Sequence, residues 1–263
     1  MQTRPLGKTG ERVAALVRAV PGGVREASLV VPDAWLRITF SESAELPRAA
    51  AARDEVLRWK LRRLVPFRVD ELRIGASEVE PLPRQEEPRR LLMGFAIELL
   101  LAQVEDAFTA AGVHLGQISN VSLSLLAALE PGVYADFTVL ASVDAGGYTL
   151  VFARRGEPVL HRYKGFTGAL PESARGAFVE RDLKLTRNFL DEQFAGSGVA
   201  SVLLEAPPEL KPLWLDRLQQ GLGEEAVAIG SRHLPAVRAE DGAVLPPWRV
   251  LAPMIGAARR EVA

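Results

Sequence analysis

The stretch Ser142-Val143-Asp144-Ala145-Gly146-Gly147-Tyr148-Thr149-Leu150-Val151-Phe152 lies near the middle of this chain of 263 residues. It reads as an apolar strand that ends in Asp, two glycines, and a second apolar strand. Some ATP-binding folds hold phosphate at such a turn, because backbone N–H groups approach the oxygens closely only where no β-carbon intervenes. The same residues also suit a plain hairpin turn. The stretch therefore raises the question of whether a nucleotide binds here.

The stretch belongs to a run of short apolar strands joined by tight turns. Phe137 to Val143, Leu150 to Ala153 and Val159 to Tyr163 follow one another, with Gly156-Glu157 as the second turn. Strands joined in this way pair antiparallel, so the run predicts a meander. A helix from about Glu172 to Phe194 follows, and its apolar positions recur at a spacing that places them on one face: Val179, Leu183, Thr186, Leu190 and Phe194.

Outside the meander, strands and helices alternate. The patterns predict strands at Ala27 to Val31, Trp35 to Phe40, Leu91 to Ala96 and Ser201 to Leu204. They predict helices at about 49 to 65, Ile97 to Ala111, Val121 to Leu129, around Leu213 to Leu218, and Val250 to Arg260 with Pro253 in its first turn. A meander among alternating elements indicates an α/β protein with a mixed sheet and helices on its faces, not a barrel or a plain Rossmann domain.

The helix predicted at 49 to 65 has an apolar side and a basic side. Leu57, Leu61, Leu64 and Val65 recur at helical spacing, and Pro66 ends the helix. The opposite side carries a set of cations: Arg53, Arg58, Lys60, Arg62 and Arg63. The simplest interpretation is a solvated face. A partner surface or a contact with acidic lipid stays open as the alternative.

Composition narrows the classes of function. The 32 basic and 33 acidic residues give a formal net charge of −1, so no overall positive field recruits nucleic acid. The chain has no cysteine, which excludes disulfides, cysteine zinc sites and thiol nucleophiles. His114, His161 and His233 are far apart in the sequence and do not form a metal-ligand spacing, so we expect no metal site.

The sequence also predicts a soluble, cytoplasmic protein. The start MQTRPLGKTGE lacks the apolar core of a secretory signal. The longest apolar run, Leu91 to Val104, contains Glu98 and is too short to cross a bilayer. Any association with a membrane is therefore expected to be indirect, through a partner.

The order and spacing of these elements resemble the actin-like ATPase superfamily. The closer resemblance is to the PilM family of type IV pilus assembly and to the cytoplasmic domain of the type II secretion L subunit. Four stretches carry it, and together they extend over about residues 25–260: Trp59 to Phe67 with Asp70-Glu71, Ala110 to Leu129, residues 142–162, and Glu180 to Leu204.

The resemblance implies an actin-like, ribonuclease H-like α/β fold of two lobes, with mixed sheets flanked by helices. The N-terminal lobe would span residues 1–135 and include an inserted small subdomain at about 41–95. The C-terminal lobe would span residues 136–263 and carry the opening stretch. In this superfamily a nucleotide lies between the lobes, held by two Asp-x-Gly hairpins and a glycine-rich adenosine loop.

One of these three nucleotide elements matches the chain. The resemblance assigns the second hairpin to Asp144, Gly146, Gly147 and Thr149, which would be the cofactor-binding residues. The residue between them, Tyr148, is bulky where the family usually has a small polar residue. We therefore expect a vestigial hairpin and no cofactor. The alternative is retained, weak binding of ATP with Mg.

The other two elements are missing at the expected positions. Residues 1–40 contain no Asp-x-Gly, and Asp33 is their only Asp. Whether a first hairpin lies upstream of Met1 is left open. At the position of the adenosine loop stands Glu205-Ala206-Pro207-Pro208-Glu209. Prolines supply no N–H there, and the acidic residues would repel a triphosphate.

The resemblance implies a non-enzymatic scaffold at the inner face of the inner membrane, in the platform of a type IV pilus or type II secretion system. Its partner would be a membrane-anchored platform protein whose N-terminal cytoplasmic segment binds a groove between subdomains. The alternative is an actin-like ATP-binding protein or ATPase. We expect no catalytic residues, because the sequence has no GxSxG, no defensible Ser–His–Asp arrangement and no clustered metal ligands. Self-association is left open.

Overall fold

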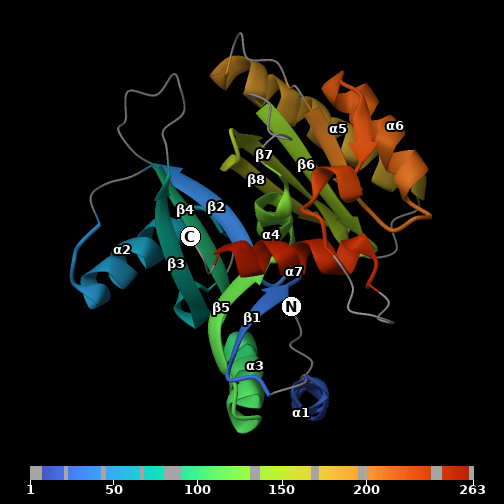
Figure 1. Ribbon diagram of the computed structural model, residues 1–263. Coiled ribbons are helices and arrows are strands. Elements are labelled where there is room, and N and C mark those ends of the chain that lie inside the picture. The colour runs from blue at the N-terminus through green and yellow to red at the C-terminus, as the bar shows by residue number, and fades with distance from the viewer. Residues whose placement is uncertain are drawn as a thin grey trace.

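The computed structural model describes residues 8–20, 23–42, 46–65, 68–79, 90–130, 137–166, 172–194, 199, 201–237 and 245–260. Figure 1 shows two groups of strands with helices around them. The larger is a five-stranded mixed sheet in the order β10-β9-β6-β7-β8. Its strands are β6 Phe137–Asp144, β7 Gly147–Arg154, β8 Glu157–Gly165, β9 Ser201–Glu205 and β10 Ala226–Ala228. Strands β6, β7 and β8 pair antiparallel in succession, which confirms the predicted meander.

Helices cover both faces of this sheet (Figure 1). On one face lie α5 Glu172–Gln193 and α6 Lys211–Leu222, and on the other α4 Val121–Ala128 and α7 Trp248–Arg260. The predicted apolar face of α5 is confirmed, because all five of its positions are buried. The prediction for Pro253 is wrong: α7 begins earlier than expected, at Trp248, so Pro253 lies inside the helix instead of in its first turn. The amide of Val250 donates to Pro247 O, which starts the helix before the predicted position.

A separate antiparallel sheet of three strands has the order β2-β4-β3. It consists of β2 Arg37–Glu42, β3 Leu72–Val79 and β4 Arg90–Ile97, and the 3-10 turn Val69–Glu71 precedes β3. Helix α2 Ala50–Arg62 packs on one face through Leu57 and Leu61. The predicted apolar side is wrong at Leu64, which lies beyond the end of the helix and is 48% exposed. Pro66 and Phe67 lie outside the described residues.

The remaining strands form a small parallel sheet. It pairs β1 Glu26–Val31 with β5 His114–Asn120, and α1 Thr9–Ala19 and α3 Glu98–Ala110 lie beside it (Figure 1). Strands β1 and β2 follow one another in the sequence, yet they join different sheets. The sequence patterns did not predict β3 or β5. Both strands mix apolar residues with polar residues and a glycine without strict alternation, and each pairs with a single described strand.

Candidate functional site

The hairpin between β6 and β7 satisfies its own turn. The amide of Gly146 donates to Asp144 Oδ1 over 2.6 Å, which closes the turn with the carboxylate that the resemblance assigned to a metal or phosphate site. Asp144 and Gly146 are exposed, whereas Gly147 and Thr149 are buried. The structure thus brings the four predicted residues together at one hairpin, but Gly147 and Thr149 are buried in strand β7.

Packing requires the second glycine. A β-carbon on Gly147 would lie 2.4 Å from Lys164 O, on the neighbouring strand β8. The bulky Tyr148 is a core residue: it lies beside Trp214, and its hydroxyl donates to Asp182 Oδ2 over 2.8 Å. Burial raises the pKa of the Tyr148 phenol. Close strand pairing and the protein core account for Gly147 and Tyr148 without a ligand.

The segment at the expected position of the adenosine loop starts a helix. Pro207 O accepts hydrogen bonds from the amides of Leu210 and Lys211, at 2.9 and 3.2 Å, and α6 follows directly. Glu205 is buried at the end of β9, and burial raises the pKa of its carboxyl group. Pro207 and Pro208 supply no N–H to a phosphate at this position.

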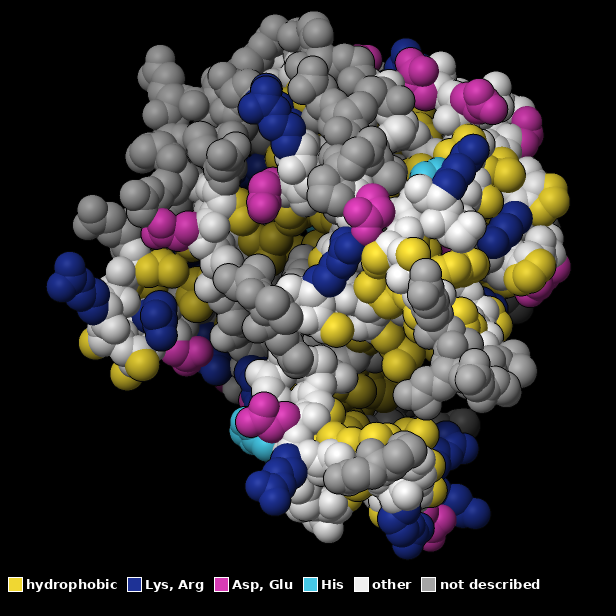
Figure 2. All heavy atoms as spheres, viewed as in Figure 1, with side chains coloured by type: hydrophobic (Ala, Val, Ile, Leu, Met, Phe, Trp, Pro, Cys, Tyr) yellow, Lys and Arg dark blue, Asp and Glu magenta, His cyan; other side chains and the backbone are white. Residues whose placement is uncertain are grey.

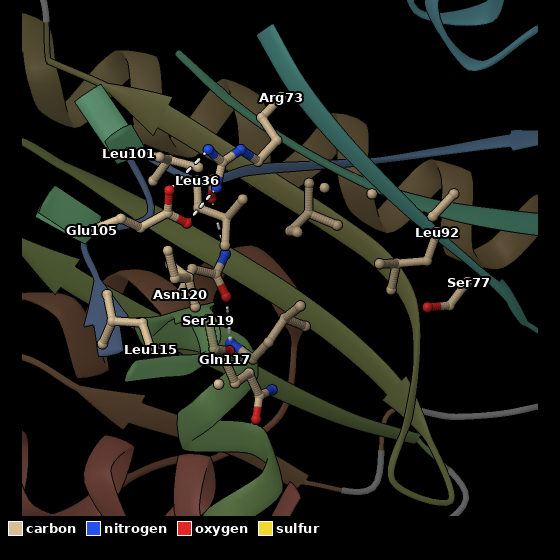
Figure 3. A pocket seen from close by; sticks show the side chains of 17 residues that line it. Leu36, Arg73, Ser77, Leu92, Leu101, Glu105, Leu115, Gln117, Ser119 and Asn120 are labelled. Atoms are coloured by element: carbon tan, nitrogen blue, oxygen red, sulfur yellow. Dashed lines mark hydrogen bonds and ion pairs between the residues drawn. The ribbon is translucent and has the colours of Figure 1, made fainter. Parts of the chain in front are cut away.

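A groove of about 510 Å³ lies between the three-stranded sheet and the parallel sheet (Figure 3). Its walls are two stretches of consecutive residues: Gly75 to Ser77 of β3 and Leu115 to Asn120 of β5. Successive side chains of a strand point to opposite faces, so a run of consecutive residues presents the strand edge. The groove therefore runs between two strand edges.

Neither edge is occupied by a described strand. Strand β5 pairs with β1 alone and β3 pairs with β4 alone, among the strands of the described residues. An open strand edge offers main-chain N–H and C=O groups to an incoming extended chain. The groove thus has the geometry that β-strand addition requires.

The lining combines an apolar floor with glycines in the strands. Leu36, Ile38, Leu92, Leu101 and Leu123 supply the larger apolar contacts. Each of the three neighbouring strands contributes one glycine: Gly75 from β3, Gly94 from β4 and Gly116 from β5. A glycine inside a strand often marks a place where another backbone approaches closely. These glycines were not predicted as site residues, and they are the sequence signal that could have indicated the groove.

An ion-pair clasp joins β3 to α3 at one end of the groove. Arg73 Nε donates to Glu98 Oε2, and Arg73 Nη2 donates to Glu105 Oε2, each over 2.9 Å. Figure 3 shows Arg73 and Glu105 pointing toward one another beside Leu101. The hydrogen bond from Arg73 lowers the pKa of Glu98, and the two carboxylates raise the pKa of Arg73. The clasp ties the three-stranded sheet to α3 and so helps to set the width of the groove.

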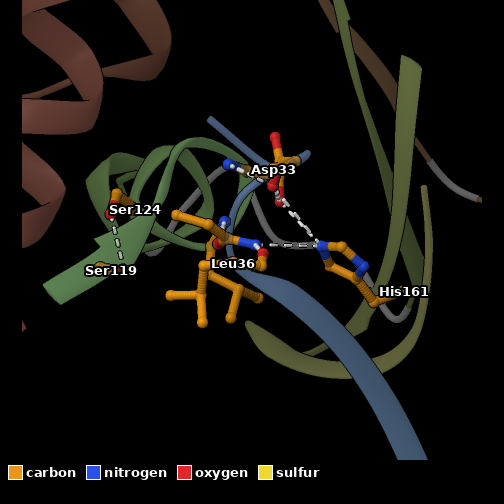
Figure 4. A network of polar contacts seen from close by, with 8 residues as sticks. Asp33, Leu36, Ser119, Ser124 and His161 are labelled. Carbon is orange, nitrogen blue, oxygen red and sulfur yellow. Dashed lines mark hydrogen bonds and ion pairs between the residues drawn. The ribbon is translucent and has the colours of Figure 1, made fainter. Parts of the chain in front are cut away.

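A buried polar network lies beside the groove, where β8 of the five-stranded sheet meets α4 (Figure 4). The Ser122 hydroxyl donates to Asp33 Oδ1, and the Ser122 oxygen lies 2.9 Å from His161 Nε2. The amide of Ser122 also donates to Asp33 Oδ1, over 3.3 Å. Asn120 lines the groove and caps α4, because its Oδ1 accepts from the amide of Leu123 over 3.1 Å. Asp33 and Asn120 together satisfy two amides in the first turn of α4.

The network has the residue types of a catalytic triad but a different geometry. In a triad one histidine nitrogen faces the serine and the other faces the carboxylate. Here Asp33 and Ser122 both lie on the Nε2 side of His161, and Nδ1 has no partner among the described residues. The His161 side chain is fully buried. No sequence pattern predicted this arrangement, because Asp33, Ser122 and His161 meet only through the fold.

A mixed sheet of five strands, an antiparallel sheet of three strands and a parallel pair, with helices around them, define an α/β protein with an actin-like fold. No protein-family model and no curated protein matches the chain. Among solved structures, the PilM–PilN type IV pilus biogenesis complex is similar, with a TM-score of 0.64 and 15% identity over 87% of this chain and 79% of that chain. This likeness establishes the fold.

Two further solved structures align with lower TM-scores. The cytoplasmic domain of EpsL, an inner membrane component of the type II secretion system of Vibrio cholerae, has a TM-score of 0.49 and 10% identity over 97% of this chain and 81% of that chain. A Bacteroides thetaiotaomicron protein with an actin-like ATPase fold and unknown function has a TM-score of 0.48 and 8% identity over 84% and 76%. Within the described residues, no helix is long and apolar enough to cross a membrane.

Proposed function

We propose that this protein is a non-enzymatic cytoplasmic scaffold that binds the N-terminal cytoplasmic segment of a membrane-anchored platform protein. The groove between β3 and β5 carries the proposal, because two open strand edges face one another across an apolar floor. A partner segment in extended form would pair its main chain with an edge and place alternate side chains on the floor.

The size and lining of the groove suit such a segment. Its volume of about 510 Å³ lies within the range of specific ligand sites. Leu36, Leu92 and Leu101 offer apolar contacts, whereas Gly75 and Gly116 leave room for a second backbone. The clasp of Arg73 closes one end, so a bound segment would enter from the other.

The fold supports a partner of this kind. The solved structure with a TM-score of 0.64 is a complex of PilM with PilN in type IV pilus biogenesis. By this likeness, the partner of the present chain would be a PilN-like protein of a pilus or secretion platform, which would hold the scaffold at the inner face of the inner membrane. Self-association is not required for a site that lies within one chain.

Substitution of Gly75 by tryptophan should abolish binding of the partner segment. A β-carbon at Gly75 would have no atom within 4 Å, so the indole would occupy the groove and leave the sheet intact. We expect the dissociation constant of a synthetic peptide of the PilN-like N-terminal segment to rise at least tenfold, about 1.4 kcal/mol, in a calorimetric titration.

Gly75→Ala is the matched control, because its single methyl group enters open space. It should bind the peptide nearly as well as the wild-type protein does. The proposal fails if the wild-type protein shows no binding at high micromolar peptide, or if Gly75→Trp binds with unchanged affinity while its melting temperature is also unchanged.

The non-enzymatic part of the proposal has a separate test. The Asp144 carboxylate is engaged by its own turn and Gly147 is required by strand packing, so we expect no MgATP site at the hairpin. Millimolar MgATP should leave the melting temperature unchanged in differential scanning fluorimetry. A ligand at one hundred times its dissociation constant would add about 2.7 kcal/mol to the free energy of unfolding, so a clear upward shift would instead favour the ATP-binding alternative.

A further inference from the structure

We infer that the outer side of α2 is a peripheral membrane contact that binds anionic lipid directly. This lipid-contact surface comprises Trp59, Lys60, Arg62, Arg63 and Leu64. The inference goes beyond the proposed groove function and does not depend on it. It also departs from the expectation that any membrane association is only indirect.

Helix geometry sets Trp59 opposite the buried side of α2. Leu57 and Leu61 pack into the core beneath the helix, and Leu61 is fully buried. Trp59 is two residues from each, which at 3.6 residues per turn places it on the other side of the helix. It is 57% exposed, and Leu64 is 48% exposed just beyond the helix end. The surface thus displays a tryptophan and a leucine to solvent.

The same surface is locally basic in a protein that is nearly neutral. It contains the three cations Lys60, Arg62 and Arg63 and no carboxylate, although the whole chain has a formal charge of −1. Arg63 lies 5.6 Å from the centre of the Trp59 ring. Figure 2 shows Lys and Arg side chains beside hydrophobic ones at the left-hand extremity, where Figure 1 places α2.

The ion pair of Arg62 leaves its charge accessible to lipid. Arg62 pairs with Asp70 over 3.0 Å, but both side chains are at least 60% exposed. Exposed ion pairs contribute little, so lipid phosphate competes for Arg62 at small cost. Arg58 is different, because it pairs with Asp54 and donates to Val69 O toward the sheet. Arg62 and Arg63, both exposed, are therefore the cations that the lipid contact uses.

Anionic lipid fits both chemical features of the surface. Tryptophan is favoured at the boundary between headgroups and acyl chains. Clustered Lys and Arg gain free energy near an anionic leaflet. An acidic protein surface would satisfy the cations but would not require the exposed indole and leucine. Apolar insertion together with charge is typical of interfacial helices.

The position of α2 allows the groove and the lipid contact to act together. Helix α2 covers the face of the three-stranded sheet formed by Leu91, Met93 and Phe95 of β4. The groove lies on the opposite face, with Leu92 and Gly94 of the same strand. A membrane against α2 would therefore leave the groove accessible to the partner segment.

Vesicle flotation tests the inference with the full chain and no partner. We expect the wild-type protein to float with vesicles that contain phosphatidylglycerol and phosphatidylcholine, and not with pure phosphatidylcholine. Raising the salt concentration should release it, because screening shortens the reach of exposed charges. The fluorescence of Trp59 should shift to shorter wavelength on binding, and Trp59→Phe should remove most of that shift.

Two variants separate this surface from general charge attraction. Arg62→Gln with Arg63→Gln should weaken vesicle binding at least tenfold, since each removes a cation near the bilayer. The control, Arg181→Gln with Lys184→Gln, removes the same charge from exposed positions of α5 and should bind like the wild-type protein. The inference is overturned if the wild-type protein does not bind phosphatidylglycerol vesicles, or if both double variants lose affinity equally. Peptide titration of the same variants keeps this result separate from the groove proposal.

Discussion

Replacing Gly256 with alanine is expected to lower the free energy of unfolding by about 3 kcal/mol, an effect far larger than a single methyl group usually causes. Gly256 lies in α7, where it packs against α4. A β-carbon at this position would lie 1.6 Å from Ser124 O, which is backbone and cannot rotate away. The two helices would have to separate, and with them the packing of Leu126, Ala128 and Ala252 on the large sheet.

The measurement is chemical denaturation followed by circular dichroism. Gly10→Ala is the matched control, because Gly10 lies within α1 and a β-carbon there would have no atom within 4 Å. Alanine is about 1 kcal/mol better than glycine in a helix interior, so the control should be neutral or slightly stabilising. A Gly256→Ala variant with wild-type stability would show that α4 and α7 do not approach this closely.

Removal of the Asp33 carboxylate should cost about 2–4 kcal/mol. The side chain is almost fully buried and accepts from both the amide and the hydroxyl of Ser122. Asp33→Ala would leave the buried amide of Ser122 without an acceptor at the start of α4, and His161 Nε2 as the remaining neighbour of the Ser122 hydroxyl. It would also remove the carboxylate that lies 3.7 Å from His161 Nε2.

Asp33→Asn is the control for this second prediction. Its amide oxygen can still accept from Ser122, so we expect no more than about half the loss caused by alanine. Equilibrium unfolding of both variants, with hydrogen exchange of the α4 amides, would test the assignment. Equal losses for Asn and Ala would indicate that the charge matters and the acceptor geometry does not.

The network belongs to a longer junction beside β8. His161 and Tyr163 alternate along the strand, so they point to the same side, whereas Val159 stands at a register shift and packs in the core on the side of α5. Val159 O accepts from Arg90 over 3.0 Å, and the Arg37 guanidinium lies 4.5 Å from the centre of the Tyr163 ring. Burial lowers the pKa of both arginines. Side chains of β2 and β4 therefore join the three-stranded sheet directly to β8 of the five-stranded sheet.

The elements with strong local periodicity were predictable from the sequence. The meander of β6, β7 and β8 follows from short apolar runs and tight turns, and α5 follows from its apolar spacing. Strands β3 and β5 were not predicted, because no local sequence pattern indicates which strands they pair with. Each alternates weakly and includes a glycine, Gly75 or Gly116, whose role depends on what lies opposite.

By itself, the sequence determined that the chain is an α/β protein with a hairpin at Asp144, because turn chemistry and hydrophobic spacing act over a few residues. Only the tertiary structure decided why position 147 must be a glycine, since Lys164 O, from another strand, is what excludes a side chain there. It also decided where the open edges of β3 and β5 meet. Contacts between residues far apart in sequence arise from packing, and no local sequence pattern predicts them.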